Sequence, residues 1–250
     1  LAASHISDWP AAAPALLALN DDADPLVHLQ SIYALGEMPD AQAARALGAF
    51  IEKDAKDKYL GLALLSSLNH ANVPALLPAL LRWSADTEAA EEAREQVIPA
   101  AVAIAITAND PETLLNMATL ITAHNQAGYA PEQFGWLVQY LDALSGKGSS
   151  LDALGPATAA DNVRGEMAKL IASARNIAID GAADEVARAG AARLMGHEAS
   201  QREPDIASLA TLLDPEGPEP VKAAALDTLL RIEDDGVPPV LFAAWPKLAE

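Results

Sequence analysis

One recurring motif decides the fold of this chain: Asp24-Pro25-Leu26-Val27-His28-Leu29-Gln30-Ser31-Ile32-Tyr33-Ala34-Leu35-Gly36. We count the positions of the motif from the aliphatic residue Val27. Small or apolar residues follow it four, seven and eight positions later. Further copies start at Leu60, Ala187 and Val221. The first two copies and the last two copies are each separated by one helix pair, a period of about 33 or 34 residues that predicts an α-solenoid.

Helical periodicity continues along the rest of the chain, and no segment shows the period of two that indicates a β-strand. The predicted helices form six pairs and half of a seventh, so we expect an all-α fold, a right-handed α–α superhelix with residues 1–250 in a single domain. The thirteen predicted helices cover residues 11–19, 25–37, 40–52, 56–68, 72–83, 87–107, 111–123, 131–145, 161–179, 183–195, 204–213, 219–232 and 237–249.

Capping residues support these boundaries. Asp110-Pro111-Glu112 supplies an N-cap, a first-turn proline and a first-turn acid, and Glu203-Pro204-Asp205 predicts a helix start in the same way. Gly36 and Gly196 stand where a glycine ends a helix. Residues 145–162 are small, polar and rich in glycine, which predicts a long loop. This loop is either a passive insertion or a soft joint between the first four pairs and the rest.

Charge and cysteine content exclude several classes of function. The formal net charge of −19 disfavours nucleic acid and anionic membranes as partners, and it favours either a basic protein partner or simple solubility. The absence of cysteine excludes disulfides, thiolate metal sites and covalent attachment of haem c within this chain. No run of eighteen apolar residues occurs, so we expect no membrane span.

The five histidines do not form a site in the sequence. None lies within a turn or two of another, so the spacing of a zinc motif is missing. We expect His28 to have a structural role, bonded to neighbouring acids or backbone. His197 follows a helix end, where the helix dipole favours a cation. The other three histidines are His5, His70 and His124.

Other residues with possible chemistry also have a structural interpretation. The carboxylates on 88–95 are expected to form a solvated helix face. Those of 21–24 lack the glycine and the closing glutamate of a calcium loop. Residues 146–149 lack the spacing of a phosphate loop and no strand precedes them, so we reject nucleotide binding. We therefore predict no catalytic, cofactor-binding or metal-binding residue. The tryptophans are interpreted as anchors between repeats, and the alternative is exposure on a docking face: Trp9, Trp83, Trp136 and Trp245.

The motif resembles short HEAT repeats, an armadillo-type fold. The order of residues 24–40, 54–68 and 133–151 is further similar to the HEAT-repeat region of large exported bacterial proteins, the membrane-bound dehydrogenases known as PVC-type haem-binding CxxCH proteins. In that family a sugar-dehydrogenase-like β-propeller precedes the helical region and a c-type cytochrome domain follows it. The resemblance covers most of residues 9–249, although His28 stands where such repeats usually carry arginine.

The resemblance implies a spacer or docking region inside a redox enzyme. The haem-binding cysteines of the family have no counterpart here, so the resemblance implies haem c only in a separate domain. It also implies export to the periplasm, although a cytoplasmic location stays open. The chain starts at Leu1 without methionine and ends at Glu250 inside a helical pattern, so we expect it to be an excerpt of a longer protein.

These inferences predict a non-catalytic scaffold for protein–protein or interdomain contact. Two alternatives stay open at this point. One is a HEAT-like lyase that binds a tetrapyrrole, against which the dispersed histidines argue. The other is a free-standing adaptor for a basic partner.

Overall fold

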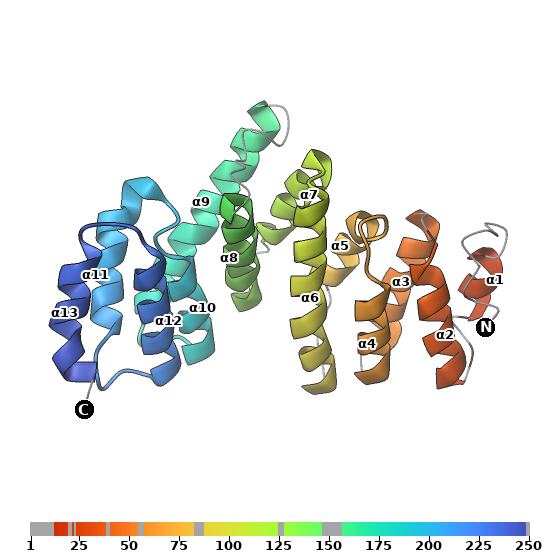
Figure 1. Cartoon of the computed structure of the whole chain (residues 1–250), viewed down its shortest axis with the longest axis horizontal. Helices are drawn as coiled ribbons and strands as arrows, with labels where there is room; N and C mark the ends of the chain where they lie inside the picture. Colours follow the sequence, from red (N-terminus) through yellow and green to blue (C-terminus); the bar gives the residue numbers. More distant parts are fainter. Residues whose placement is uncertain are drawn as a thin grey trace. The chain divides into compact units, whose positions relative to one another are not determined.

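The computed structural model describes residues 13–19, 22, 24–38, 41–54, 58–82, 88–124, 128–146 and 157–248. Within these residues the chain is all-α, with thirteen α-helices and no strand (Figure 1). The helices are α1 (Ala13–Ala18), α2 (Pro25–Gly36), α3 (Ala41–Asp54), α4 (Lys58–Ser67), α5 (Val73–Arg82), α6 (Glu88–Ala108), α7 (Pro111–Ile121), α8 (Pro131–Gly146), α9 (Ala157–Ile179), α10 (Glu185–Leu194), α11 (Arg202–Leu212), α12 (Glu219–Arg231) and α13 (Val237–Leu248).

All thirteen predicted helices are confirmed, and most ends differ from the prediction by one or two residues. The largest difference is at α9, which begins at Ala157, four residues earlier than predicted. The loop predicted at 145–162 is therefore shorter: its ends belong to α8 and α9, and residues 147–156 lie outside the described residues. None of the helices in the described ranges is long and apolar enough to cross a bilayer.

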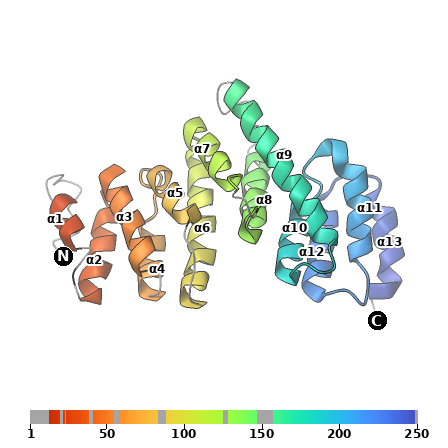
Figure 2. The ribbon, with the colours of Figure 1, turned by 180° about the vertical axis from the view of Figure 1, so that it is seen from behind.

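The chain divides into two compact units, residues 1–120 and residues 121–250. In unit 1, α2, α4 and α6 pack side by side, and α1, α3 and α5 form a second row against them (Figures 1 and 2). In unit 2, α8, α10 and α12 pack side by side, and α10 also contacts α9 while α11 packs against α12 and α13. Within each unit, the second helices of successive predicted pairs are therefore neighbours.

The repeat motif lies at the contacts between these neighbours. In all four copies the residues four, seven and eight positions after the first are buried. At the eighth position Leu35 and Leu229 are fully buried, Met195 is 1% exposed and Leu68 is 9% exposed. Burial of such side chains contributes the main stabilising free energy of each helix pair. The register predicted from the sequence is thus the register of the core.

Small residues let α2 and α4 approach closely. A Cβ atom added at Gly36 would lie 2.5 Å from the Cβ of Ser67, and one added at Gly61 would lie 2.5 Å from the Cβ of Ala93 on α6. Gly36 is the last residue of α2, and it does not have the positive φ of a glycine that ends a helix. The predicted capping role of Gly36 is therefore wrong, because the glycine is needed for close packing of two helices. Gly196 does have a positive φ, 81°, as predicted.

Side-chain caps fix several helix ends. Asp24 Oδ1 accepts from the Leu26 amide at 2.9 Å at the start of α2. Asp110 Oδ2 accepts from the Thr113 amide at 2.9 Å at the start of α7. The hydrogen bonds from the Thr113 side chain and backbone lower the pKa of Asp110, outweighing the effect of burial. Each carboxylate satisfies an amide that has no partner within its own helix.

Candidate functional site

A group of charged side chains lies around the turn between α10 and α11, residues 195–201. Gly196 opens the turn with its left-handed backbone, which only glycine adopts without strain. A short 3₁₀ helix, Ala199–Gln201, then leads into α11. Charged side chains from α8, α9, α11 and α12 converge on this turn, so it is the candidate functional site of the described residues.

On one side of the turn, Asp205 of α11 is 1% exposed and carries three hydrogen bonds. It accepts from Arg175 Nε at 2.7 Å, from Arg175 Nη2 at 3.2 Å and from the Gly196 amide at 2.8 Å. Arg175 of α9 also pairs with Glu198 at 2.9 Å. Burial acts to lower the pKa of Arg175, but the hydrogen bonds to Asp205 and Glu198 outweigh it and raise that pKa. This two-point pairing holds α9, α11 and the turn together.

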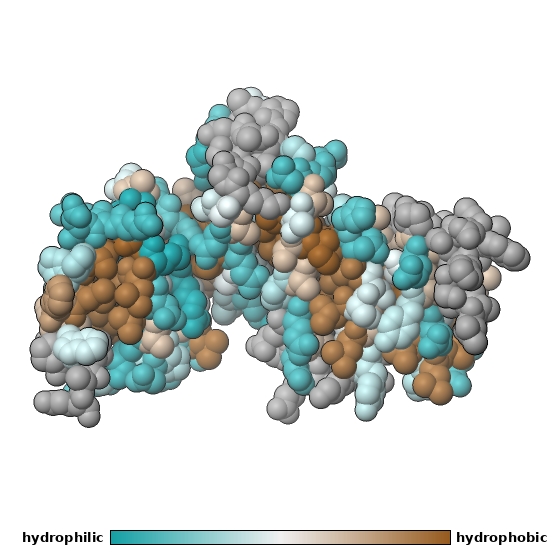
Figure 3. Space-filling view, in the orientation of Figure 1, coloured by the Kyte–Doolittle hydropathy of each residue, from teal (hydrophilic) through white to brown (hydrophobic). Residues whose placement is uncertain are grey.

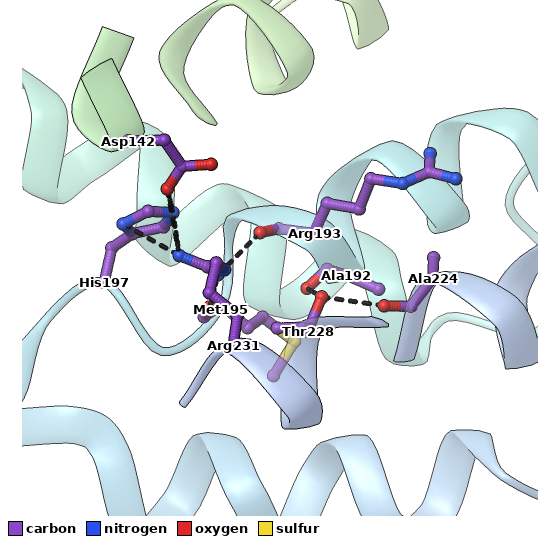
Figure 4. Close-up of polar contacts among 8 residues, drawn as sticks. All are labelled: Asp142, Ala192, Arg193, Met195, His197, Ala224, Thr228 and Arg231. Carbon is purple, nitrogen blue, oxygen red and sulfur yellow. Dashed lines mark hydrogen bonds and ion pairs between the residues drawn. The ribbon is translucent and has the colours of Figure 1, made fainter. Parts of the chain in front are cut away.

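On the other side, Arg231 of α12 binds the carbonyl end of α10. Its Nη2 donates to the Arg193 carbonyl at 3.0 Å and to the Met195 carbonyl at 2.8 Å. Its Nη1 lies 3.4 Å from Asp142 Oδ1 of α8 and contacts the ring nitrogens of His197 (Figure 4). Burial lowers the pKa of Arg231 despite the neighbouring Asp142. The cluster of Asp142, His197 and Arg231 therefore connects α8, α10 and α12.

His197 is neutral in this cluster. Burial and the positive charge of Arg231 lower its pKa to about 3. The expectation that His197 supplies a cation at this helix end is thus wrong. Arg231 supplies that cation, and a second positive charge beside it is unfavourable. Because its pKa is far from neutrality, His197 is also poorly matched to general acid–base work.

A buried hydroxyl lies next to this cluster. Thr228 Oγ1 donates to the Ala224 carbonyl of its own helix at 2.7 Å and lies 3.2 Å from the Ala192 carbonyl of α10 (Figure 4). Ser67 of unit 1, at the same motif position, lies 2.8 Å from the Ala63 carbonyl of its own helix and 3.3 Å from the Ile32 carbonyl of α2. Both hydroxyls thus connect one helix of the row to the preceding one.

The remaining histidines have other surroundings. His28 is buried, with its ring edge-to-face on Phe50 at 5.7 Å between centroids. His70 is exposed. His124 lies 3.9 Å from Glu166 Oε2 and 5.1 Å from the Tyr129 ring. His5 lies outside the described residues. Among the residues that the structure describes, no three His, Asp or Glu side chains group as metal ligands do.

The acidic segments also have local roles where they are described. Asp22 Oδ1 accepts from the Asp24 amide at 2.9 Å, so these two carboxylates order the start of α2. Glu92 is the only acid of residues 88–95 with a described side chain, and it is exposed. Residues 147–150 of the glycine-rich segment lie outside the described residues.

The interpretation of the tryptophans as anchors is wrong at one described position. Trp245 of α13 is 73% exposed, whereas Trp136 of α8 is partly buried. The exposure of Trp245 follows from the position of α13, which packs against α11. Trp9 and Trp83 lie outside the described residues.

Sequence reasoning missed the residues that matter most at this turn, Arg175, Asp205 and Arg231. Asp205 is 30 residues from Arg175, and the partners of Arg231 are at least 34 residues away along the chain, so no local spacing marks these pairs. One signal was available: Arg231 stands in the last turn of a helix, where a cation binds carbonyl groups.

The chain matches no family model, no curated protein and no solved structure. The geometry of the turn itself indicates its role. Its charged groups are engaged with one another and with backbone atoms, and this arrangement is suited to holding helices in place.

Proposed function

We propose that this chain is an α-solenoid of HEAT-like, armadillo-type helix pairs, wound as a right-handed superhelix, that acts as a non-catalytic scaffold for protein–protein or interdomain contact. One observation carries the proposal: the same interhelix contact recurs at the same motif position. Ser67 reaches back to α2 at 3.3 Å and Thr228 reaches back to α10 at 3.2 Å. Recurring contacts between neighbouring repeats are the basis of a stacked array.

The packing in each unit supports this architecture. α4 has α2 and α6 as neighbours, and α10 has α8 and α12. A stack of this kind is stabilised by contacts between adjacent repeats, and it leaves long exposed faces that other proteins can bind. The charged cluster at the α10–α11 turn belongs to this stack, because it connects three helices of one row.

The charge of the chain and the resemblance of its sequence indicate what the scaffold contacts. A net charge of −19 favours a basic protein surface as partner. By resemblance, the scaffold belongs to an exported multidomain dehydrogenase and holds an electron-donating domain near a c-type cytochrome domain. In this proposal the segment itself holds no cofactor, and haem c is bound by the separate cytochrome domain.

Removing one repeat tests the proposal. The chain has no cysteine, so Gln30→Cys on α2 and Gln96→Cys on α6 place two unique spin labels at exposed positions that are two repeat periods apart. Deletion of residues 37–69 removes one period. In a stacked array α2 then packs on α6, and the label distance measured by electron spin resonance falls by about 8–10 Å, one interhelix spacing.

The helical signal per residue in circular dichroism is the control for folding. The proposal expects it to stay unchanged after the deletion, because each repeat contacts only its neighbours. Loss of the helical signal, or a label distance that does not shorten, would show that unit 1 is an ordinary globular bundle and would contradict the scaffold.

A further inference from the structure

Unit 1 exposes four large apolar or aromatic side chains on two helices that pack against each other. Leu26 and Tyr33 of α2 are 68% and 40% exposed, and Tyr59 and Leu62 of α4 are 72% and 45% exposed. We refer to these four residues as the α2/α4 strip. In Figure 3 apolar surface is visible over the lower part of α2.

The repeat register places these side chains on one continuous face. Leu26 and Tyr59 each stand directly before the first position of a motif copy, so they are equivalent and lie on adjacent helices. Tyr33 follows Leu26 by seven residues, which is about two turns on the same side of α2. Leu35 and Ile32, on the other side of α2, are buried.

The equivalent positions of unit 2 show what the fold requires at these places. In unit 2 the positions equivalent to Tyr33 are occupied by Arg193 on α10 and Asp227 on α12, and both are exposed. The positions equivalent to Leu26 are occupied by Val186 and Pro220, which are also exposed. The position of Tyr33 thus tolerates charge in unit 2, so the fold does not require an aromatic side chain there. Tyrosine is enriched at protein-binding surfaces.

Acidic side chains border the strip. Asp24 precedes α2 and Glu37 follows it, and both are exposed. On α6, Glu92 is exposed and stands one repeat period after Tyr59, in the equivalent place of the next helix. A second copy of the chain would bring the same acids face to face, which disfavours it as the occupant. The complementary partner has apolar anchors and basic flanks.

We propose that the α2/α4 strip is the docking surface for a basic amphipathic helix of a partner protein. This inference rests on the proposed scaffold function and names its partner class. A helix with leucines at i, i+3 or i+4 and i+7 presents anchors along about 10 Å, which matches the spacing of about 8–10 Å between two packed helices. Lysine or arginine beside those anchors would face Asp24, Glu37 and Glu92.

The probe is a fluorescently labelled synthetic peptide, about five helical turns long, with leucines at helical spacing and lysines elsewhere. Its binding to the full chain is measured by fluorescence anisotropy at about 0.15 M salt, where loose charge attraction is screened. We expect binding that weakens at least tenfold in the double variant Leu26→Ser with Tyr59→Ser. The matched control is Val186→Ser, the equivalent position in unit 2, which is 74% exposed. This control should stay within twofold of the parent chain.

Several outcomes would overturn the docking proposal. The peptide could fail to bind, or it could bind the double variant as tightly as the parent chain. A peptide with serine in place of leucine could also bind equally well, and binding would then be due to charge attraction alone. Sedimentation showing a dimer that the double variant abolishes would assign the strip to a second copy instead. The spin-label experiment tests the scaffold separately, so failure of docking leaves that result intact.

Discussion

The C-terminal ends of α2 and α10 occupy the same place in the repeat motif, yet different side chains satisfy their carbonyl groups. In unit 1, Asn69 Nδ2 donates to the Gly36 carbonyl at 2.8 Å. In unit 2, Arg231 donates to the Arg193 and Met195 carbonyls. Asn69 follows the end of α4 and Arg231 is the last residue of α12, so each cap comes from the region where the next helix in the row ends.

The difference shows which part of the repeat is constrained. The backbone must find donors for the last carbonyls of each helix, and either a neutral amide or a guanidinium supplies them. A guanidinium inside a turn then needs acceptors for its charge, which explains Asp142 and the neutral His197 beside Arg231. The charged groups of unit 2 are thus a second solution to the problem that unit 1 solves with asparagine.

The largest effect is expected where unit 2 buries charge. Asp205→Ala removes the acceptor of Arg175 and of the Gly196 amide, so the free energy of unfolding should fall by about 3–5 kcal/mol. Urea unfolding followed by circular dichroism measures it. The matched control is Asp161→Ala, which removes an exposed ion pair with Arg164 and should cost less than about 0.5 kcal/mol. Equal small changes in both variants would mean that the buried pair of unit 2 contributes no more to stability than an exposed ion pair.

A smaller effect is expected from the pH dependence of the free energy of unfolding, which His197 beside the Arg231 cap contributes. The folded pKa of His197, about 3, lies below its ordinary value, so the unfolded chain binds the proton first as the pH falls. The contribution of His197 to stability is therefore complete above about pH 6.5 and is lost as the pH falls toward 3. Each pH unit inside this window costs at most about 1.4 kcal/mol.

The variant His197→Gln isolates this contribution, because a glutamine does not titrate. Between about pH 6.5 and pH 4.5 the parent should lose about 1–2 kcal/mol more than the variant, measured by urea unfolding at each pH. His124→Gln, at an exposed histidine, serves as the control and should follow the parent. A parent and variant with parallel pH profiles would mean that His197 is not held neutral by Arg231 and burial.

The smallest effect compares the equivalent hydroxyls of the two units. Thr228→Val and Ser67→Ala each remove one hydroxyl that connects neighbouring helices, and each should lower the free energy of unfolding by about 1 kcal/mol. Thr107→Val removes an exposed hydroxyl that bonds only its own helix, and it should change stability by less than about 0.5 kcal/mol. A large loss in one unit without a loss in the other would break the equivalence of the two positions.

The sequence was sufficient to predict the helices and the buried positions, because both follow from local periodicity. The apolar positions of the motif, such as Leu35 and Leu229, are buried, and Gly196 was correctly predicted to end a helix. Asp110 also acts as the predicted cap, since capping depends on residues two or three positions away.

Tertiary packing explains what the sequence did not predict. Gly36 looks like a helix-ending glycine, but its role depends on Ser67, which belongs to another helix and becomes a neighbour only after folding. Trp245 looks like a core residue, but its exposure depends on what packs against α13. Asp205 and Arg175 look like surface charges, and only the turn at Gly196 brings them together in a buried pair.

The central claim is that both units are stacks of equivalent repeats. Native-state hydrogen exchange, resolved by residue, tests it most directly in the variants Leu229→Ala and Leu35→Ala. Each leucine is fully buried at the same motif position, so each variant should be less stable by about 2–5 kcal/mol where the loss is felt. In Leu229→Ala we expect amide protection to fall most in α12 and α10 and less in α8, with α2 and α4 unchanged. Leu35→Ala should lower protection in α2 and α4 and leave α10 and α12 unchanged. An equal loss of protection in every helix would contradict the repeat register and the stack built on it. So would a loss of stability of only about 0.5 kcal/mol in both variants, which is the size expected for an ordinary surface substitution.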